Sequence, residues 1–85
     1  MARPRTRTYR IDAETIVRGL FDEGSEESLL LELAACNKFQ LIASRRDWNR
    51  ILWLLVNHFK DSSGRPIFIG ERLGEIHRSL PVEFR

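Results

Sequence analysis

The most regular pattern of hydrophobic and polar positions lies in residues 45–60. Apolar residues return there at every third or fourth position, which is the spacing of the buried stripe of an amphipathic helix. These positions are Trp48, Ile51, Leu52, Leu55, Val56 and Phe59. Ser44 precedes the pattern and Asp47 follows three residues later, which matches a variant of the capping box. We therefore predict a helix from Arg45 to about Lys60.

Residues 12–36 carry the signals of two shorter helices joined by a tight turn. Asp12 is a favourable N-cap, and the apolar residues that follow it share one helical face. Gly24 is a natural C-terminal stop, and Ser25 can cap a second, leucine-rich helix. Asn37, which tolerates the left-handed conformation, is placed to end that helix. The segment is predicted to be a helical hairpin.

The other elements are short. Residues 7–11 and 38–43 alternate in the manner of short strands, and residues 67–69 are β-prone and could pair with residues 38–43. A last short helix is predicted over residues 71–80, where Pro81 ends it.

These elements predict an α+β, helix-dominated fold. It consists of a helical hairpin, a central amphipathic helix, a short C-terminal helix and a small two- or three-stranded sheet. An all-α bundle is the alternative if residues 38–43 and 66–69 are merely extended. Residues 9–85 are expected to form a single small globular domain, and residues 1–8 a flexible basic arm in front of it.

The length of the chain limits what it gains by folding alone. With 85 residues, 42% of them hydrophobic, burial of apolar surface nearly cancels the loss of chain entropy, so a partner surface would help. The longest apolar run, Ile51 to Val56, is far shorter than a membrane span, and no membrane partner is expected. No secretory signal is recognisable and Cys36 is the single cysteine, so a cytoplasmic location is expected.

Charge is unevenly distributed, although the formal net charge is only +2. Residues 1–10 contain four arginines and no acidic residue, whereas residues 11–36 contain seven acidic residues and one arginine. Residues 37–60 are basic again, with five basic residues against one aspartate. This segregation can steer a partner, or it can reflect internal complementarity between the acidic hairpin and the basic helix.

Trp53 falls outside the apolar stripe of the helix over residues 45–60. At about 100° per residue, its neighbours on the helix surface are polar or basic. They are Arg46, Asn49, Arg50, Asn57 and Lys60. A tryptophan framed by Arg and Asn has the composition of an interface hot spot, so these residues form the predicted partner-binding surface. The alternative is that the helix is covered on both sides and buries Trp53 in a second contact layer.

The N-terminal arm is a second candidate surface. Its arginines are Arg3, Arg5, Arg7 and Arg10. They can contact phosphates or enter a minor groove, and with the basic face of the helix over residues 45–60 they suggest an alternative function as a nucleic-acid-binding regulator. The acidic stretch of residues 11–36 argues against a wide electrostatic contact. A solvated terminus without a ligand is the more common role of such an arm.

Residues able to carry catalysis are sparse. The chain has no glycine-rich phosphate loop, no paired-cysteine metal site and no His-Glu-x-x-His motif. Cys36 ends a leucine-rich helix, where a small buried hydrophobe is the usual role, and His58 and His77 lie at the edge or on the apolar side of their helices. The protein is therefore expected not to be an enzyme and to use no cofactor, metal or small-molecule substrate.

These expectations favour a small interaction module. It would be an adaptor or inhibitor that binds and occludes a macromolecular partner. Its small size and the lack of a familiar motif suggest an origin in a phage or other mobile element. The partner is expected to be another protein or a second copy of the chain, so a dimer is predicted. Nucleic acid is the alternative partner.

Overall fold

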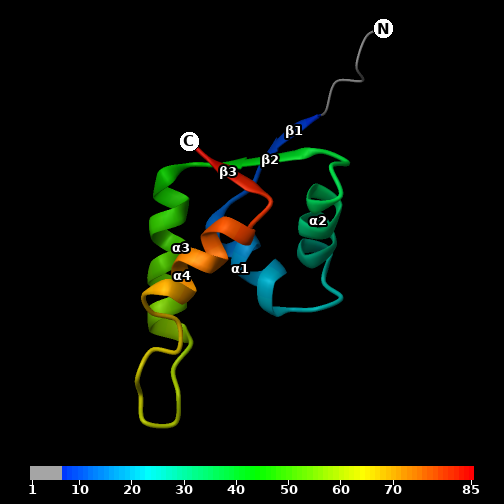
Figure 1. The fold of residues 1–85 in the computed structure, drawn as a ribbon. Coiled ribbons are helices and arrows are strands. Elements are labelled where there is room, and N and C mark those ends of the chain that lie inside the picture. The colour runs from blue at the N-terminus through cyan, green and yellow to red at the C-terminus, as the bar shows by residue number, and fades with distance from the viewer. Residues whose placement is uncertain (1–6) are drawn as a thin grey trace, which may run out of the picture.

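The computed structural model describes residues 7–85, which form four helices and a three-stranded sheet (Figure 1). The elements, in chain order, are β1 (Thr8–Arg10), α1 (Ala13–Phe21), α2 (Glu26–Ala35), β2 (Gln40–Ala43), α3 (Arg45–His58), α4 (Glu71–Ser79) and β3 (Val82–Phe84). The predicted α+β, helix-dominated class is confirmed, and the all-α alternative is wrong. Of the predicted arm, residues 1–6 lie outside the described residues, and Thr8 already belongs to β1.

The sheet is parallel, in the order β1-β2-β3, and the four helices lie on one side of it (Figure 1). The helices α1 and α2 form the crossover from β1 to β2, and α3 and α4 form the crossover from β2 to β3, as parallel neighbours require. Tyr9 is in register with Leu41, and Leu41 with Val82. Because Leu41 is buried, this register row faces the helices.

The third strand is not the segment that the sequence favours. Residues 67–69 do not pair with residues 38–43, so this prediction is wrong. The Ile67 N–H donates to the carbonyl oxygen of Phe59 over 3.0 Å, because the segment folds back onto the end of α3 as a hairpin. The ring of Phe68 then lies 5.7 Å from that of Phe59, where it serves a local aromatic cluster. β3 takes the place beside β2.

The helix ends follow the predicted local signals. Asp12, Ser25 and Ser44 cap α1, α2 and α3, and each side chain accepts a hydrogen bond from a backbone N–H three residues further on. Ser44 and Asp47 complete a reciprocal capping box. Asn37 follows α2 with φ of 60°, in the left-handed region. Local chemistry therefore sets where three of the helices begin.

The core lies between the helices and the sheet. Its fully buried large side chains are Ile16 of α1 and Ile51 and Leu55 of α3. Gly19 of α1 permits a close approach to α2, since a Cβ atom at this position would lie 2.7 Å from Cδ1 of Leu31. The side of α3 that carries Ile51 and Leu55 is thus fixed against the core, and its opposite side is left on the surface.

The sheet face turned away from the helices is uncovered within residues 7–85. Leu41 and Ala43 are buried toward the helices, so strand alternation places their neighbours on the opposite face. That face carries Thr8, Arg10, Gln40, Ile42 and Glu83. It is mostly polar, and Gln40 Nε2 donates to Glu83 Oε2 over 2.8 Å. Parallel sheets are usually covered on both faces, so this bare face is unusual.

Candidate functional site

Trp53 lies on the outer side of α3, opposite the core residues Ile51 and Leu55. Its side chain is 49% exposed. Of the two interpretations that the sequence left open, the structure therefore matches the exposed one, since about half of the Trp53 surface stays accessible. Leu54, the next residue along α3, is half-buried, so the packed side of the helix extends as far as Leu54 but does not include the indole of Trp53.

Neighbouring side chains hold the indole of Trp53 in place. The guanidinium carbon of Arg50 lies 4.8 Å from the centre of the ring, in cation–π geometry. The Nε of Arg50 also donates to Glu14 Oε1 over 3.0 Å, which ties this arginine to α1. The ring of His58 stands edge-on to the indole at 5.5 Å. On the next turn, Asn57 Nδ2 donates to the backbone oxygen of Trp53 over 2.8 Å.

The predicted partner-binding residues mostly share the exposed side of α3. We call this surface the Trp53 patch: Trp53, Arg46, Asn49, Arg50 and Asn57, all exposed. Lys60 was predicted as a further member, but α3 ends at His58 and Lys60 lies beyond it, in an isolated bridge with Pro66. The patch contains two arginines and no acidic residue.

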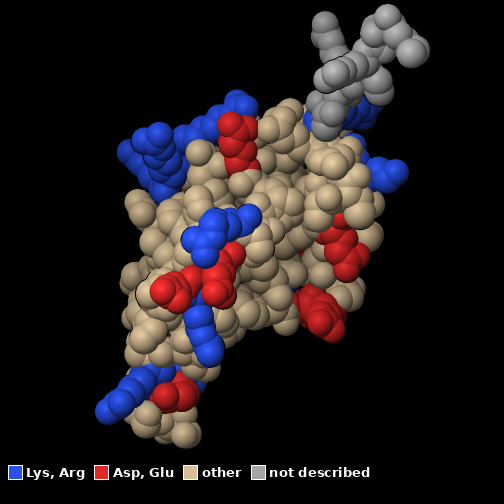
Figure 2. Space-filling model, in the orientation of Figure 1, with Lys and Arg blue, Asp and Glu red and all other residues tan. Residues whose placement is uncertain are grey.

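Four arginines were predicted to contact nucleic acid, and two of them, Arg3 and Arg5, lie outside the described residues. Arg7 and Arg10 are exposed beside and within β1. The Arg45 N–H donates to the carbonyl oxygen of Arg85 over 3.2 Å, which joins the start of α3 to the end of β3. We call this surface the basic sheet end: Arg10, Arg45 and Arg85, at or just beyond the carboxyl ends of the strands, whereas Arg7 lies at the amino end of β1. Figure 2 shows basic side chains gathered at this end of the molecule.

The candidate catalytic residues lie on different elements. The predicted burial of Cys36 is wrong: it is exposed, because α2 ends at Ala35 and Cys36 follows as its C-cap. His77 is exposed on α4, with its ring 4.5 Å from Trp48 and 5.5 Å from Phe84. His58 contacts Trp53 as described above. Across residues 7–85, no three His, Cys, Asp or Glu side chains gather as metal ligands.

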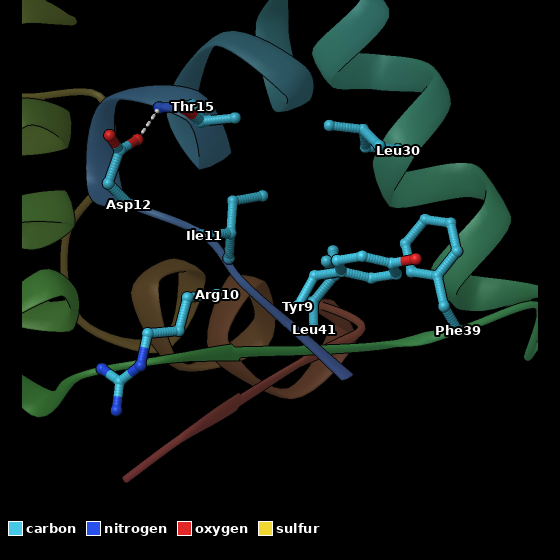
Figure 3. A pocket seen from close by; sticks show the side chains of 8 residues that line it. All are labelled: Tyr9, Arg10, Ile11, Asp12, Thr15, Leu30, Phe39 and Leu41. Carbon is cyan, nitrogen blue, oxygen red and sulfur yellow. Dashed lines mark hydrogen bonds between the residues drawn. The ribbon is translucent and has the colours of Figure 1, made fainter. Parts of the chain in front are cut away.

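A groove between β1, α1 and α2 has no counterpart in the sequence predictions (Figure 3). Its volume is about 480 Å³. Tyr9 and Phe39 stand edge to face at 5.4 Å along one side, and Leu30 of α2 faces them across the groove. Asp12 and Thr15 line its polar side. No local signal reveals it, since Tyr9 and Phe39 meet only once β1 has paired with β2.

Two carboxylates are held in their charged form by hydrogen bonds. The hydroxyl and the backbone N–H of Thr15 lower the pKa of Asp12 below its ordinary value. The hydroxyl of Ser63, together with the Arg65 N–H, lowers the pKa of Asp61 in the hairpin that follows α3. Asp12 therefore contributes a fixed negative charge at the side of the groove.

Comparison with known proteins adds no family to these observations. No protein-family model matches the chain, and no curated protein or solved structure matches it. No helix within residues 7–85 has the length and apolar character needed to cross a bilayer. The surfaces that remain as candidates for function are the Trp53 patch, the basic sheet end and the groove beside β1.

Proposed function

We propose that the protein is a small non-enzymatic interaction module that binds a protein partner through the Trp53 patch and occludes the surface it covers. The observation that supports this proposal is the indole of Trp53, 49% exposed on the outer side of α3. Tryptophan and arginine are the residues most enriched among those that dominate interface energies. Trp53 is not needed in the core, because Ile51 and Leu55 already anchor α3 there.

The patch is preorganised, which favours binding. Arg50 is held between Glu14, at 3.0 Å, and the indole of Trp53, at 4.8 Å. An indole already confined by Arg50 and His58 loses little rotational freedom when a partner covers it. Since ordering an interface side chain costs about 0.5–1.5 kcal/mol, this confinement improves affinity without any added contact.

The charge of the patch indicates the chemistry of the partner. Arg50 engages Glu14 through Nε, which leaves its Nη groups for a carboxylate of the partner. Arg46, two helical turns before Trp53, is exposed on the same side. A partner that presents an apolar pocket bordered by Asp or Glu fits this arrangement.

The experiment uses the full chain, immobilised, to capture its partner from an extract of the organism that encodes it. The captured protein is identified, purified and titrated against variants by calorimetry. Trp53→Ala is expected to weaken binding by about 30-fold or more, which corresponds to roughly 2 kcal/mol, while the melting temperature changes little. Leu29→Ala is the matched control, because Leu29 is 53% exposed but lies on α2. Equal losses of affinity in the two variants would contradict the proposal, as would a Trp53→Ala variant that loses folding and binding together.

Nucleic-acid binding through the basic sheet end is a second candidate function, favoured by one observation. Of the seven acidic residues in residues 11–36, six belong to α1, α2 or the turn between them. The basic sheet end lies at the sheet, where Arg10, Arg45 and Arg85 stand at or just beyond the carboxyl ends of neighbouring strands. The fold therefore places most of the acidic hairpin away from these strand ends, where Asp12 and Glu14 still follow closely after Arg10 and Arg85 is paired with Glu83 at 3.0 Å. This arrangement weakens part of the electrostatic argument against nucleic-acid binding.

A labelled DNA duplex titrated at several salt concentrations tests this second candidate. Replacing Arg10 and Arg85 by Ala is expected to reduce both the affinity and its salt dependence. Replacing Arg65 and Arg72 by Ala removes the same charge from the hairpin and α4, and is expected to have little effect. Affinity that does not change with salt, or that falls equally in both double variants, would exclude the basic sheet end.

A further inference from the structure

β1 is an edge strand whose outer side is unpaired within residues 7–85. The carbonyl oxygen of Arg7 and the N–H of Ile11 hydrogen-bond to β2, at 2.7 and 2.9 Å. Backbone groups alternate in direction along a strand, so those of Tyr9 also face β2, and those of Thr8 and Arg10 point away from it. The edge therefore offers two N–H donors and two carbonyl acceptors to another strand.

The groove lies directly beside this open edge. Tyr9 of β1 is 46% exposed and Leu30 of α2 is 39% exposed, so apolar surface continues from the strand to the helix (Figure 3). Side chains of an added strand that point to the helix side of the sheet would enter the groove. The edge and the groove thus form one surface, separate from the Trp53 patch on α3.

We propose that β1 pairs antiparallel with β1 of a second copy of this chain, joining two three-stranded sheets across a two-fold axis. The segment Thr8–Arg10 is self-complementary about Tyr9: Thr8 of each copy faces Arg10 of the other, and the outward backbone groups of both residues are satisfied reciprocally. The two Tyr9 side chains then face each other across the axis and fill the two grooves.

Charge favours a second copy as the occupant. Arg7 lies on the same strand face as Tyr9 and Ile11, and antiparallel pairing about Tyr9 places it opposite Ile11 of the other copy. Asp12, the next residue, lines the groove and stays charged because its pKa is lowered. Each copy therefore offers an arginine to the other's aspartate. The wider sequence matches this pattern, because residues 1–10 carry four arginines and residues 11–36 seven acidic residues.

The opposite edge of the sheet does not offer an equivalent surface. Antiparallel pairing of β3 with a second β3 about its central residue would place two Glu83 carboxylates directly opposite each other. Like charges in that position destabilise a strand pair. The Glu83 carboxylate is also engaged by Gln40 and Arg85, at 2.8 and 3.0 Å. β1 is therefore the edge suited to self-association.

Sedimentation of the full chain from micromolar to millimolar concentration tests the association. The weight-average mass is expected to rise from 10.0 kDa toward twice that value. Arg10→Pro removes an outward N–H that β2 does not use, and is expected to abolish the rise, whereas Arg10→Ala keeps this N–H and should still associate. A mass that stays monomeric throughout overturns the proposal, as does association of Arg10→Pro equal to that of Arg10→Ala.

A disulfide test fixes the register without relying on the proline variant. In a Cys36→Ser background, Tyr9→Cys is expected to form an intermolecular disulfide under mild oxidation, because paired residues on the axis have Cβ atoms about 4.5–5.5 Å apart. Thr8→Cys is the matched control, since its diagonal partner lies about 7–8 Å away and should cross-link far less. Equal cross-linking of the two variants, or none by Tyr9→Cys, overturns the proposed pairing. A Trp53→Ala variant is expected to dimerise normally, because Trp53 lies on α3, away from β1. The dimer proposal and the proposal of partner binding through the Trp53 patch can therefore fail independently.

Discussion

Gly19 provides a direct test of how α1 packs against α2. A Cβ atom built at this position would lie 2.7 Å from Leu31 Cδ1 and 2.8 Å from the carbonyl oxygen of Glu27. Leu31 is only 7% exposed, so its side chain cannot rotate freely into solvent. The Glu27 oxygen belongs to the backbone of α2, and relieving that contact requires the whole helix to shift. Gly19→Ala therefore creates a clash that side-chain rotation alone does not remove.

Two opposing effects set the size of the change. Alanine in place of glycine favours a helix by about 1 kcal/mol, because it restricts the unfolded chain. Overpacking a filled site costs about 1–3 kcal/mol, and a backbone contact places Gly19 at the upper end of that range. We expect the variant to lose about 1–2 kcal/mol of unfolding free energy. With a denaturant slope of roughly 1.5 kcal/mol/M, the urea midpoint falls by about 1 M.

Gly74 of α4 supplies the matched control for Gly19. A Cβ atom there would lie 3.2 Å from Nη1 of Arg78, the far end of a flexible, exposed side chain that can move aside. Gly74→Ala is therefore expected to stabilise the protein by up to about 1 kcal/mol. Both variants are compared with the parent protein by urea unfolding followed by far-ultraviolet circular dichroism. If Gly19→Ala is as stable as Gly74→Ala, the close approach of α1 and α2 is refuted.

Three further substitutions test other parts of the structure. Ile51→Ala removes a fully buried side chain and should cost about 2–5 kcal/mol in chemical unfolding, whereas a loss below about 1 kcal/mol would contradict its central position. Trp53→Ala should change stability by less than about 1 kcal/mol in the same assay, and a core-sized loss would show that the indole is buried. Asp12→Asn keeps the cap but removes the carboxyl group that titrates. Because the pKa of Asp12 is lowered in the folded state, its charge stabilises the fold fully at pH values above the ordinary pKa of 3.8. This contribution is lost as the pH falls through the lowered pKa of the folded state. The stability difference between parent and Asp12→Asn should therefore shrink in acid, and a constant difference would show that Asp12 does not titrate in this way.

Helix boundaries were predictable because their causes are local. Asp12, Ser25 and the pair of Ser44 and Asp47 act within three residues of themselves, and each caps the helix that the sequence assigned to it. The apolar stripe of α3 is equally local, and it correctly separates the buried Ile51 from the exposed side of the helix.

Strand pairing could not be predicted in the same way. Residues 67–69 have the higher β-propensity, yet β3 forms beside β2 because α4 returns the chain to the sheet after Pro81. That choice depends on the length and direction of a crossover, which no short pattern encodes. The groove has the same origin, since Tyr9 and Phe39 come together through the pairing of β1 with β2. Glycine ordinarily lowers the stability of a helix, and the packing role of Gly19 appears only when α2 is in place.

The structure also distinguishes the two explanations of the segregated charge. Internal complementarity requires ion pairs between the acidic hairpin and the basic segments, and within residues 7–85 the pair that provides this is Glu14 with Arg50, at 3.0 Å. Arg18 bonds instead to Asp22 and Glu27, inside the hairpin. Most acidic side chains of the hairpin are exposed, and Figure 2 shows acidic side chains on the α2 side of the molecule, away from the basic side chains near the start of α3. Internal pairing among residues 7–85 thus accounts for little of the segregation, and steering of a charged partner stays a prediction.

Steering has a kinetic signature that differs from that of the Trp53 contact. Charges separated from a partner by more than about 8–10 Å are screened at physiological salt, so raising the salt concentration should slow association with the captured partner. Dissociation breaks the contacts of the indole and the covered contact between Arg50 and the partner's carboxylate, which salt screens much less than distant charges, so its rate should change less. Trp53→Ala should do the reverse and accelerate dissociation while association is nearly unchanged. Stopped-flow measurements at two salt concentrations give the association and dissociation rate constants separately. If salt changed only the dissociation rate constant, the exposed charges would act within the contact and not at a distance.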